Sequence, residues 1–151
     1  MYETKLISSQ KTYPLRLEVL WSHFNTLEEC GIDVDDKEGT FHVGVFKDGE
    51  VVSVGTFLIQ NNKFFDEESQ YRLRAMATSP KVRGEGFGQQ LIGFAINELQ
   101  NRDVKMLWCD ARKIALGFYQ KNGFTVIGDY YDVPKIGPHK LMYYKIRNHE
   151  Q

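Results

Sequence analysis

A chain of 151 residues with a formal net charge of −1 is long enough to build one hydrophobic core, and its balanced charge excludes the strongly basic surface of a nucleic-acid or anionic-membrane binder. It has no apolar run long enough to cross a bilayer, and its N-terminus lacks the apolar block of a signal peptide. Its two cysteines, Cys30 and Cys109, make no disulfide framework and lack zinc-binding spacing, so the sequence predicts a cytoplasmic single domain over 1–151 without a metal site.

The first half of the chain reads as a strand, a helix and a β-hairpin. Residues 4–8 predict a short strand, and Thr12-Tyr13-Pro14 supplies a cap and an N-terminal proline for a helix. The acidic residues 28–36 that follow are expected to form a solvated loop with room for a short second helix. Two strand-like segments, 41–47 and 50–60, flank Asp48-Gly49, which is a strong hairpin-turn signal.

The second half begins with a strand over 71–78 and a Ser79-Pro80 break. Apolar residues at a spacing of four, from Phe87 to Leu99, predict a long amphipathic helix. A short buried strand is expected at 106–109, and a second amphipathic helix at 111–122, closed by Gly123. Strands at 124–127 and 141–146 follow, separated by a loop over 130–140, and the tail at 149–151 is expected to be frayed. This order predicts an α+β fold with a mixed, mostly antiparallel sheet of about seven strands flanked by helices.

A glycine-rich loop, Arg83-Gly84-Glu85-Gly86-Phe87-Gly88, precedes the long helix. Unpaired N–H groups and the positive dipole end of a helix N-terminus form an anion site, and glycine lets a phosphate approach the backbone. The loop is not a Walker P-loop, because no Gly-Lys-Ser/Thr follows, and it lacks the N-terminal βαβ unit of a dinucleotide-binding fold. On its own, the loop is equally consistent with tight packing.

The complete pattern Arg-x-x-Gly-x-Gly in this loop resembles the pyrophosphate loop of the GNAT superfamily of N-acetyltransferases, whose fold also has the predicted element order. The resemblance implies an acetyl-CoA site in which the preceding strand runs beside the pantetheine arm and offers N–H groups to an oxyanion. The cofactor-binding residues that it implies are Met76, Ala77, Thr78, Arg83, Gly84, Glu85, Gly86, Phe87, Gly88 and Gln89.

The string Tyr119-x-Lys121-x-Gly123-Phe124 resembles a second GNAT signature. In many members of the superfamily that tyrosine protonates the departing thiolate, so the resemblance implies that Tyr119 is a catalytic acid. From the residues alone, the favoured interpretation of Tyr119 is a half-buried helix aromatic like its neighbour Phe118; the glycine-rich loop shifts the preference to the acid role. Cys109 lacks an adjacent base and is expected to be a core strand residue.

Two longer strings, 107–112 and 131–139, are similar to one branch in particular, that of glyphosate N-acetyltransferase and its bacillus-type relatives. The similarity implies that Arg74 and Arg112 face the acidic groups of the acceptor and that His139 accepts the amine proton. Histidine suits this role because its reference pKa, about 6.5, lies near the working pH. Arg72 lies on the same strand face as Arg74 and could exchange roles with it.

The sequence also departs from this branch. A further arginine of the branch falls on Trp21 here, and Asp110 occupies a position where the branch usually has asparagine. Both changes disfavour a doubly anionic, phosphonate-type acceptor and favour an amine with one carboxylate or with an apolar part resting on Trp21.

The leading hypothesis is therefore an acetyl-CoA-dependent N-acetyltransferase that acetylates the primary or secondary amine of a small, amino-acid-like acceptor by direct attack in a ternary complex. The alternatives are a protein or peptide N-acetyltransferase and a non-catalytic acyl-CoA-binding sensor. No nucleic-acid or membrane partner is expected. The natural acceptor, the use of glyphosate and the oligomeric state, a homodimer included, are left open.

Overall fold

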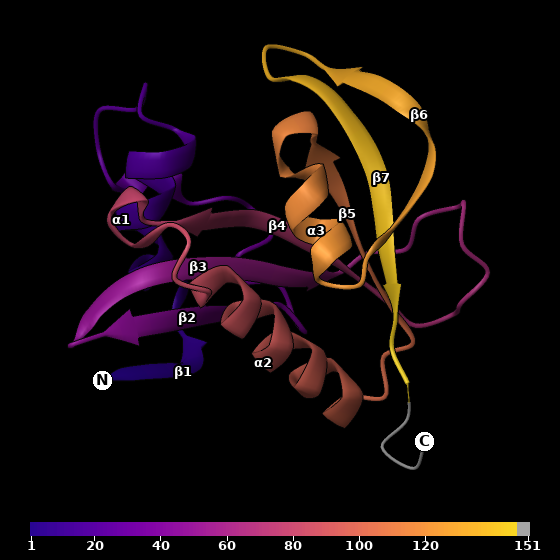
Figure 1. Ribbon diagram of the computed structural model, residues 1–151, viewed down its shortest axis with the longest axis horizontal. Helices are drawn as coiled ribbons and strands as arrows, with labels where there is room; N and C mark the ends of the chain where they lie inside the picture. Colours follow the sequence, from indigo (N-terminus) through magenta and orange to yellow (C-terminus); the bar gives the residue numbers. More distant parts are fainter. Residues whose placement is uncertain (148–151) are drawn as a thin grey trace. The chain divides into compact units, whose positions relative to one another are not determined.

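The computed structural model describes residues 1–147, and the tail expected to be frayed, 149–151, lies outside them (Figure 1). The strands are β1 (Tyr2–Ile7), β2 (Phe41–Lys47), β3 (Glu50–Ile59), β4 (Gln70–Thr78), β5 (Met106–Arg112), β6 (Thr125–Val133) and β7 (Gly137–Lys145). The helices are α1 (Tyr13–Leu15), α2 (Phe87–Asn101) and α3 (Leu116–Lys121), with a π-helical turn at Arg16–Leu20 and 3₁₀ turns at Ser9–Thr12, Glu28–Cys30, Pro80–Val82 and Lys113–Ala115.

The strands form one seven-stranded sheet in the order β1-β2-β3-β4-β5-β7-β6. β4 and β5 pair in parallel, while β1 with β2, β2 with β3, β5 with β7 and β6 with β7 pair antiparallel. The predicted α+β class with a mixed, mostly antiparallel sheet is thus confirmed. By internal contacts the chain forms two compact units: unit 1 comprises Met1–Ile59 and Leu73–Glu98, and unit 2 comprises Gln60–Arg72 and the chain from Leu99 onward.

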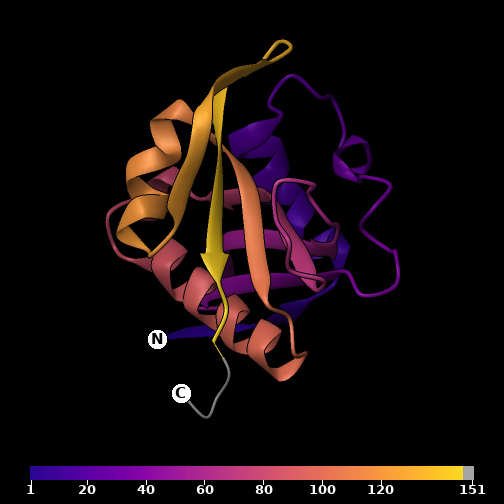
Figure 2. The ribbon, with the colours of Figure 1, turned by 90° about the vertical axis from the view of Figure 1, so that its right-hand side faces the viewer.

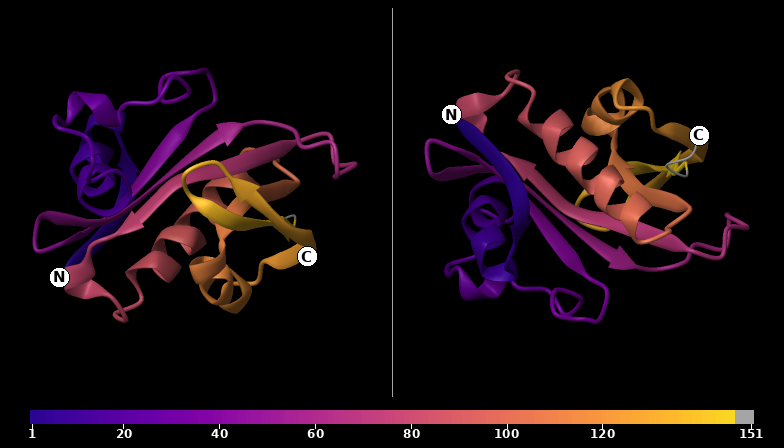
Figure 3. Two further views of the ribbon diagram at one scale, coloured as in Figure 1. Left: turned by 90° about the horizontal axis from the view of Figure 1, so that it is seen from above. Right: turned by 90° about the horizontal axis from the view of Figure 1, so that it is seen from below.

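In unit 1, α1 and α2 cover opposite faces of the strands (Figure 3). Val54 of β3 packs with Leu15 of α1, whereas a Cβ on the next residue, Gly55, would lie 3.0 Å from the side chain of Leu91 in α2. Successive residues of a strand point to opposite faces, so the alternation in β3 requires one helix on each side. The predicted hairpin at Asp48-Gly49 and the predicted start of the long helix at Phe87 are both confirmed.

The sequence predicted that the acidic segment of unit 1 is solvated. This prediction is wrong for Asp35, which is buried. Its carboxylate receives two hydrogen bonds of 2.8 Å from the guanidinium of Arg16, whose side chain is 0% exposed. Arg16 also donates to the carbonyl of Cys30 and to Oγ1 of Thr56. The segment is therefore fixed to the first helical turns by an ion pair that the sequence pattern did not indicate.

In unit 2, β5, β7 and β6 lie side by side and α3 packs beside them (Figure 2). Two boundaries predicted here were wrong. Ala111 and Arg112 continue β5 instead of starting a helix, and most of the predicted loop over 130–140 belongs to β6 and β7. The cause is cross-strand pairing, since Arg112 pairs with His139 and Val133 with Gly137, extending all three strands. Gly123 closes α3 as predicted, with a φ of 92°.

Candidate active site

The glycine-rich loop of unit 1 has a backbone that only glycine adopts without strain. Gly84 and Gly86 have φ values of 83° and 87°, in the left-handed region, and added Cβ atoms would meet nothing within 4 Å. These glycines are therefore required by conformation, not by packing against the protein. The packing interpretation of the loop is accordingly disfavoured.

The loop ends in backbone donors at the start of α2. The amide of Glu85 donates to Val82 O and that of Gln90 to Gly86 O. For the amides of Phe87, Gly88 and Gln89, no backbone acceptor is found within residues 1–147, as expected for the first turn of a helix. With the positive dipole end of a 15-residue helix and the cation of Arg83 nearby in sequence, these donors can hold an anionic group such as a diphosphate.

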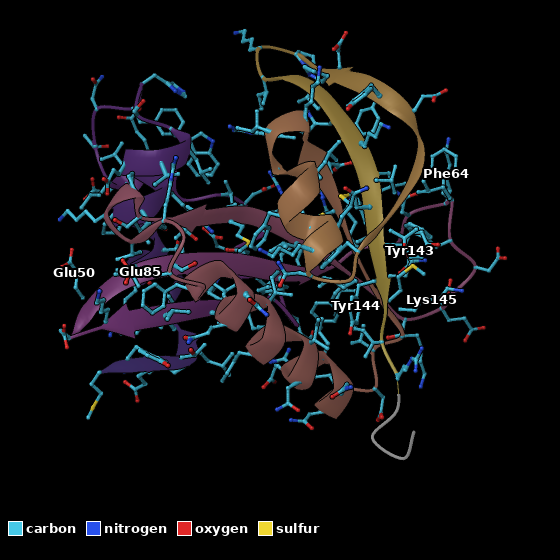
Figure 4. All side chains as sticks on the ribbon, viewed as in Figure 1. Glu50, Phe64, Glu85, Tyr143, Tyr144 and Lys145 are labelled. Atoms are coloured by element: carbon cyan, nitrogen blue, oxygen red, sulfur yellow. The ribbon has the colours of Figure 1, made fainter. Side chains whose placement is uncertain are left out.

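Side chains brace the same loop from within unit 1. Glu85 accepts a hydrogen bond of 3.0 Å from Lys47 Nζ at the end of β2, and Figure 4 shows Glu85 beside that end of the sheet. Ser79 caps the 3₁₀ turn before the loop by accepting from the amide of Lys81. The predicted loop residues are thus anchored at both sides, which keeps their main-chain donors aligned.

The C-terminal end of β4 contains Met76, Ala77 and Thr78, the residues predicted to lie beside the pantetheine arm of the cofactor. Ala75, just before them, has a φ of 52°, an uncommon conformation for a residue with a Cβ. Thr78 shares a hydrogen bond of 2.9 Å with Ser53, and Ala77 packs in the core beside Leu15. β4 is therefore irregular where the sequence predicts cofactor contact, and strained backbone of this kind is concentrated at functional sites.

Trp21 ends the π-helical turn of unit 1 and is half-buried. Its amide donates to Arg16 O at 2.8 Å, and its ring lies 5.8 Å from the Arg16 guanidinium and 5.9 Å from the ring of Phe24. π-Helical turns are frequently found at functional sites. Trp21 and Arg74 both belong to unit 1, and their predicted contact with an acceptor stays a prediction.

Arg112 and His139 are brought together in unit 2. They are paired residues on β5 and β7, so their side chains share one face of the sheet and their Cβ atoms are neighbours. His139 is 5% exposed, and its Nδ1 lies 2.9 Å from the carbonyl oxygen of Gly137. A carbonyl can only accept, so Nδ1 carries the proton and Nε2 is left as the basic nitrogen.

Tyr119 of α3 is 8% exposed, and its ring packs edge-on against Phe118 and Phe124. Burial raises the pKa of its hydroxyl well above the usual value, an effect that the positive charge of Arg112 partly opposes. Tyr119 therefore holds its proton and can act as a donor. Burial likewise raises the pKa of the Cys109 thiol, which fits the predicted core role and not that of a nucleophile.

Sequence reasoning missed a polar network on the same face of β5. Asp110 accepts one hydrogen bond of 2.7 Å from Arg72 and another from the hydroxyl of Tyr131, each on a different carboxylate oxygen. Arg72 also donates to Gln60 and lies 5.0 Å from the ring of Trp108. Its guanidinium is thus engaged within unit 2 of the protein.

Farther along this face, unit 2 contains a cavity of about 410 Å³. Its walls include Phe64, Met106 and Tyr143, and Figure 4 shows Phe64, Tyr143 and Lys145 around it. Met106 and Tyr143 share the face of Arg112 and His139, because paired residues of β5 and β7 alternate in step. Within residues 1–147, no helix is long and apolar enough to cross a membrane, and no cluster of His, Cys, Asp and Glu has the arrangement to hold a metal ion.

Comparisons with known proteins address the family and the fold of this chain. A family model described as the acetyltransferase (GNAT) family matches residues 5–124. YitI of Bacillus subtilis (strain 168), described as an uncharacterized N-acetyltransferase, is 40% identical over 147 residues, covering 97% of this chain and 98% of its own. ElaA of Escherichia coli has a similar structure, with a TM-score of 0.73 at 21% identity over 95% of this chain and 99% of its own. An aminoglycoside 6'-N-acetyltransferase complexed with coenzyme A gives a TM-score of 0.78 at 12% identity, covering 97% and 98%. At these identities the two structures establish a shared fold.

Proposed function

Because this chain belongs to the acetyltransferase (GNAT) family and is an N-acetyltransferase, we propose that it acetylates the amine of a small acceptor that carries one carboxylate, with acetyl-CoA as the acetyl donor. The observation that carries the proposal is the pairing of Arg112 with His139 on adjacent strands. A fixed cation beside a basic imidazole nitrogen is suited to bind a carboxylate and deprotonate an ammonium group of the same small molecule.

The chain's residues fit the cofactor that the family uses. The left-handed backbone at Gly84 and Gly86 and the amides of Phe87 and Gly88 form a cradle without side chains, suited to a diphosphate, and Arg83 adds a positive charge. When bound there, acetyl-CoA supplies an acetyl thioester. The donors at the start of α2 hold and orient it, so less orientational freedom remains to be lost when the acceptor arrives.

The steps of the reaction are assigned to five residues. Arg112 binds the carboxylate through charge-assisted hydrogen bonds that orient the amine. Arg74 is assigned the same role from the similarity of the sequence to the glyphosate N-acetyltransferase branch. Nε2 of His139 takes the proton that the attacking amine must lose, because Nδ1–H is held by the carbonyl of Gly137. Tyr119, whose pKa is raised by burial, returns a proton to the leaving thiolate. Trp21 offers an apolar surface to the acceptor, as the sequence suggests.

A second candidate is an extended, peptide-like acceptor, because the cavity beside Phe64 lies on the same sheet face as His139. Tyr143 lies four residues beyond His139 in β7, a span of about 13 Å at the usual strand rise. Such a distance is too long for a free amino acid and suits several residues of an extended chain. The two candidates differ in the length of the acceptor, not in the chemistry at His139.

A screen of acceptors tests both candidates. Thiol release from acetyl-CoA would be followed with amino acids, aminophosphonates, polyamines and short peptides. We expect amino-acid-like amines with one carboxylate to give the highest kcat/KM. A preference for peptides would replace the proposal by the second candidate. Binding of acetyl-CoA by calorimetry without thiol release for any amine would instead indicate a non-catalytic sensor.

Replacement of His139 tests its role as the base. His139→Ala should lower kcat by at least about a hundredfold, because a general base usually contributes a rate factor of that size or more. The affinity for acetyl-CoA should stay within about twofold of the wild-type value. The exposed His23 supplies the matched control, and His23→Ala should retain the wild-type kcat. Unchanged turnover in His139→Ala would reject the assignment.

A further inference from the structure

The proposed base is flanked by a tyrosine whose position depends on an irregular strand. Ile127 of β6 pairs with Leu141 of β7, but the next pair is Tyr131 with His139, so β6 has two extra residues at this point. In a regular ladder, Asp129 would lie opposite His139. The irregularity includes Gly128, whose φ of 83° allows the chain to bulge. The strand is thus shaped to place an aromatic ring, and not a carboxylate, beside the imidazole.

The ring of Tyr131 faces that of His139. The two rings are tilted by 30° with centroids 6.3 Å apart, within the range of aromatic contacts. The Tyr131 hydroxyl donates to Oδ1 of Asp110, while Oδ2 of Asp110 is held by Arg72 at 2.7 Å. A continuous chain of contacts therefore runs from β4 through β5 to β6 and ends at His139.

We propose that Asp110 and Tyr131 are positioning residues for His139, in which Asp110, held by Arg72, anchors the Tyr131 hydroxyl so that the ring keeps the imidazole aligned. This proposal rests on the assignment of His139 as the base. Burial, and then the hydrogen bond to Asp110, raises the pKa of Tyr131, so its hydroxyl remains a donor to the carboxylate. A rigid imidazole matters because small errors in the placement of a catalytic group reduce the rate strongly.

Removal of a single hydroxyl tests the arrangement. Tyr131→Phe keeps the ring and deletes its anchor, and we expect kcat to fall about tenfold, with KM for acetyl-CoA unchanged. Tyr130→Phe is the matched control, because the ring of Tyr130 contacts Lys140 and Lys113 and phenylalanine keeps those contacts. Asp110→Asn, which retains an oxygen to accept from Tyr131, should keep more activity than Asp110→Leu. The reverse order would contradict the proposal.

A double-mutant cycle asks whether Tyr131 acts through His139. In a His139→Ala background, Tyr131→Phe should have no further effect on kcat, because the group that it positions is gone. An independent effect of the same tenfold size in both backgrounds would overturn the proposal, since Tyr131 would then act elsewhere.

A measurement without any acceptor separates this proposal from the proposed function. In nitrogen-15 NMR of the free protein, wild-type His139 should show one narrow set of ring signals, and Tyr131→Phe should shift and broaden them, because the imidazole then samples more orientations. If no amine is acetylated but this change is seen, the proposed function fails and the positioning role stands. If the ring signals of His139 and kcat are both unaffected by Tyr131→Phe, the positioning role is refuted, whatever the acceptor.

Discussion

Replacement of Gly86 by alanine measures how far the proposed cofactor loop depends on its backbone conformation. A residue with a Cβ in the left-handed region costs about 1–2 kcal/mol. No atom lies within 4 Å of the Cβ that would be added at Gly86, so steric overlap contributes nothing and the cost is conformational alone. If the loop relaxes in the free protein and must be forced back by the ligand, the whole cost appears in binding. The Kd for coenzyme A should then rise about five- to thirtyfold.

Gly93 in α2 provides the matched control. It is exposed, lies in the same helix, and likewise has nothing within 4 Å of an added Cβ, but it has no positive φ. Gly93→Ala should leave the Kd for coenzyme A unchanged and raise the free energy of unfolding by about 0.5–1 kcal/mol, because alanine loses less conformational entropy in a helix than glycine does.

Calorimetric titration with coenzyme A and urea denaturation of both variants provide the two readings. If Gly86→Ala keeps its strained backbone, the loss appears in the free energy of unfolding and the Kd stays unchanged. The sum of the two losses should be about 1–2 kcal/mol. A Gly86→Ala protein with wild-type affinity and wild-type stability would refute the requirement for a left-handed residue in this loop.

Two further predictions concern the buried network of unit 1. Asp35→Asn should lower the free energy of unfolding by about 3–5 kcal/mol in urea denaturation, because it leaves the fully buried Arg16 guanidinium without its counter-charge. As the control, Asp33→Asn at an exposed position should change the free energy of unfolding by less than about 0.5 kcal/mol. Burial lowers the pKa of His42, so the folded state keeps this ring neutral while the unfolded chain takes up a proton below about pH 6.5. Stability should therefore fall between pH 7.5 and pH 5.5, and a His42→Gln protein should lose less over the same interval; an equal loss would assign the effect to another group.

The direction of this pH effect follows from the hydrogen bonds of His42. Its Nε2 lies 3.1 Å from the carbonyl oxygen of Asp35 and must donate, so Nδ1 accepts from the Thr56 hydroxyl at 2.9 Å. Thr56 in turn accepts from Arg16. A proton on Nδ1 would leave the Thr56 hydroxyl without its acceptor and place a second cation near Arg16. Both effects oppose protonation, in agreement with the lowered pKa.

Much of unit 1 could be predicted because its signals are local. Asp48-Gly49 lies at the turn between two segments with strand character, and the observed β2 has the predicted bounds of Phe41–Lys47. The start of α2 at Phe87 follows from glycines before it and apolar residues at helical spacing after it. Each signal depends on residues within a few positions of each other, so a single sequence contains it.

The errors in unit 2 arise where distant residues decide the structure. Pro134, Gly137 and Pro138 are typical of a loop, yet Gly137 and Pro138 are paired in β7 because β6 folds back upon them. The partner of Arg112 in the sheet, His139, is 27 residues away, and no pattern within β5 indicates that the strand continues that far. The buried pair of Arg16 and Asp35 is likewise invisible in the sequence, because an acidic stretch looks solvated until its cation is found.

Asp110 shows how such distant pairing changes a conclusion about specificity. A count of arginines along the strands gives Arg112 and either Arg74 or Arg72 as the cations for the acceptor. The structure removes Arg72 from that count, because Asp110 offsets its charge at 2.7 Å and also engages Tyr131. Within unit 2, Arg112 is the arginine that pairs with His139 in the sheet. A guanidinium beside the proposed base can bind a carboxylate beside the amine, in agreement with the proposed amino-acid-like acceptor.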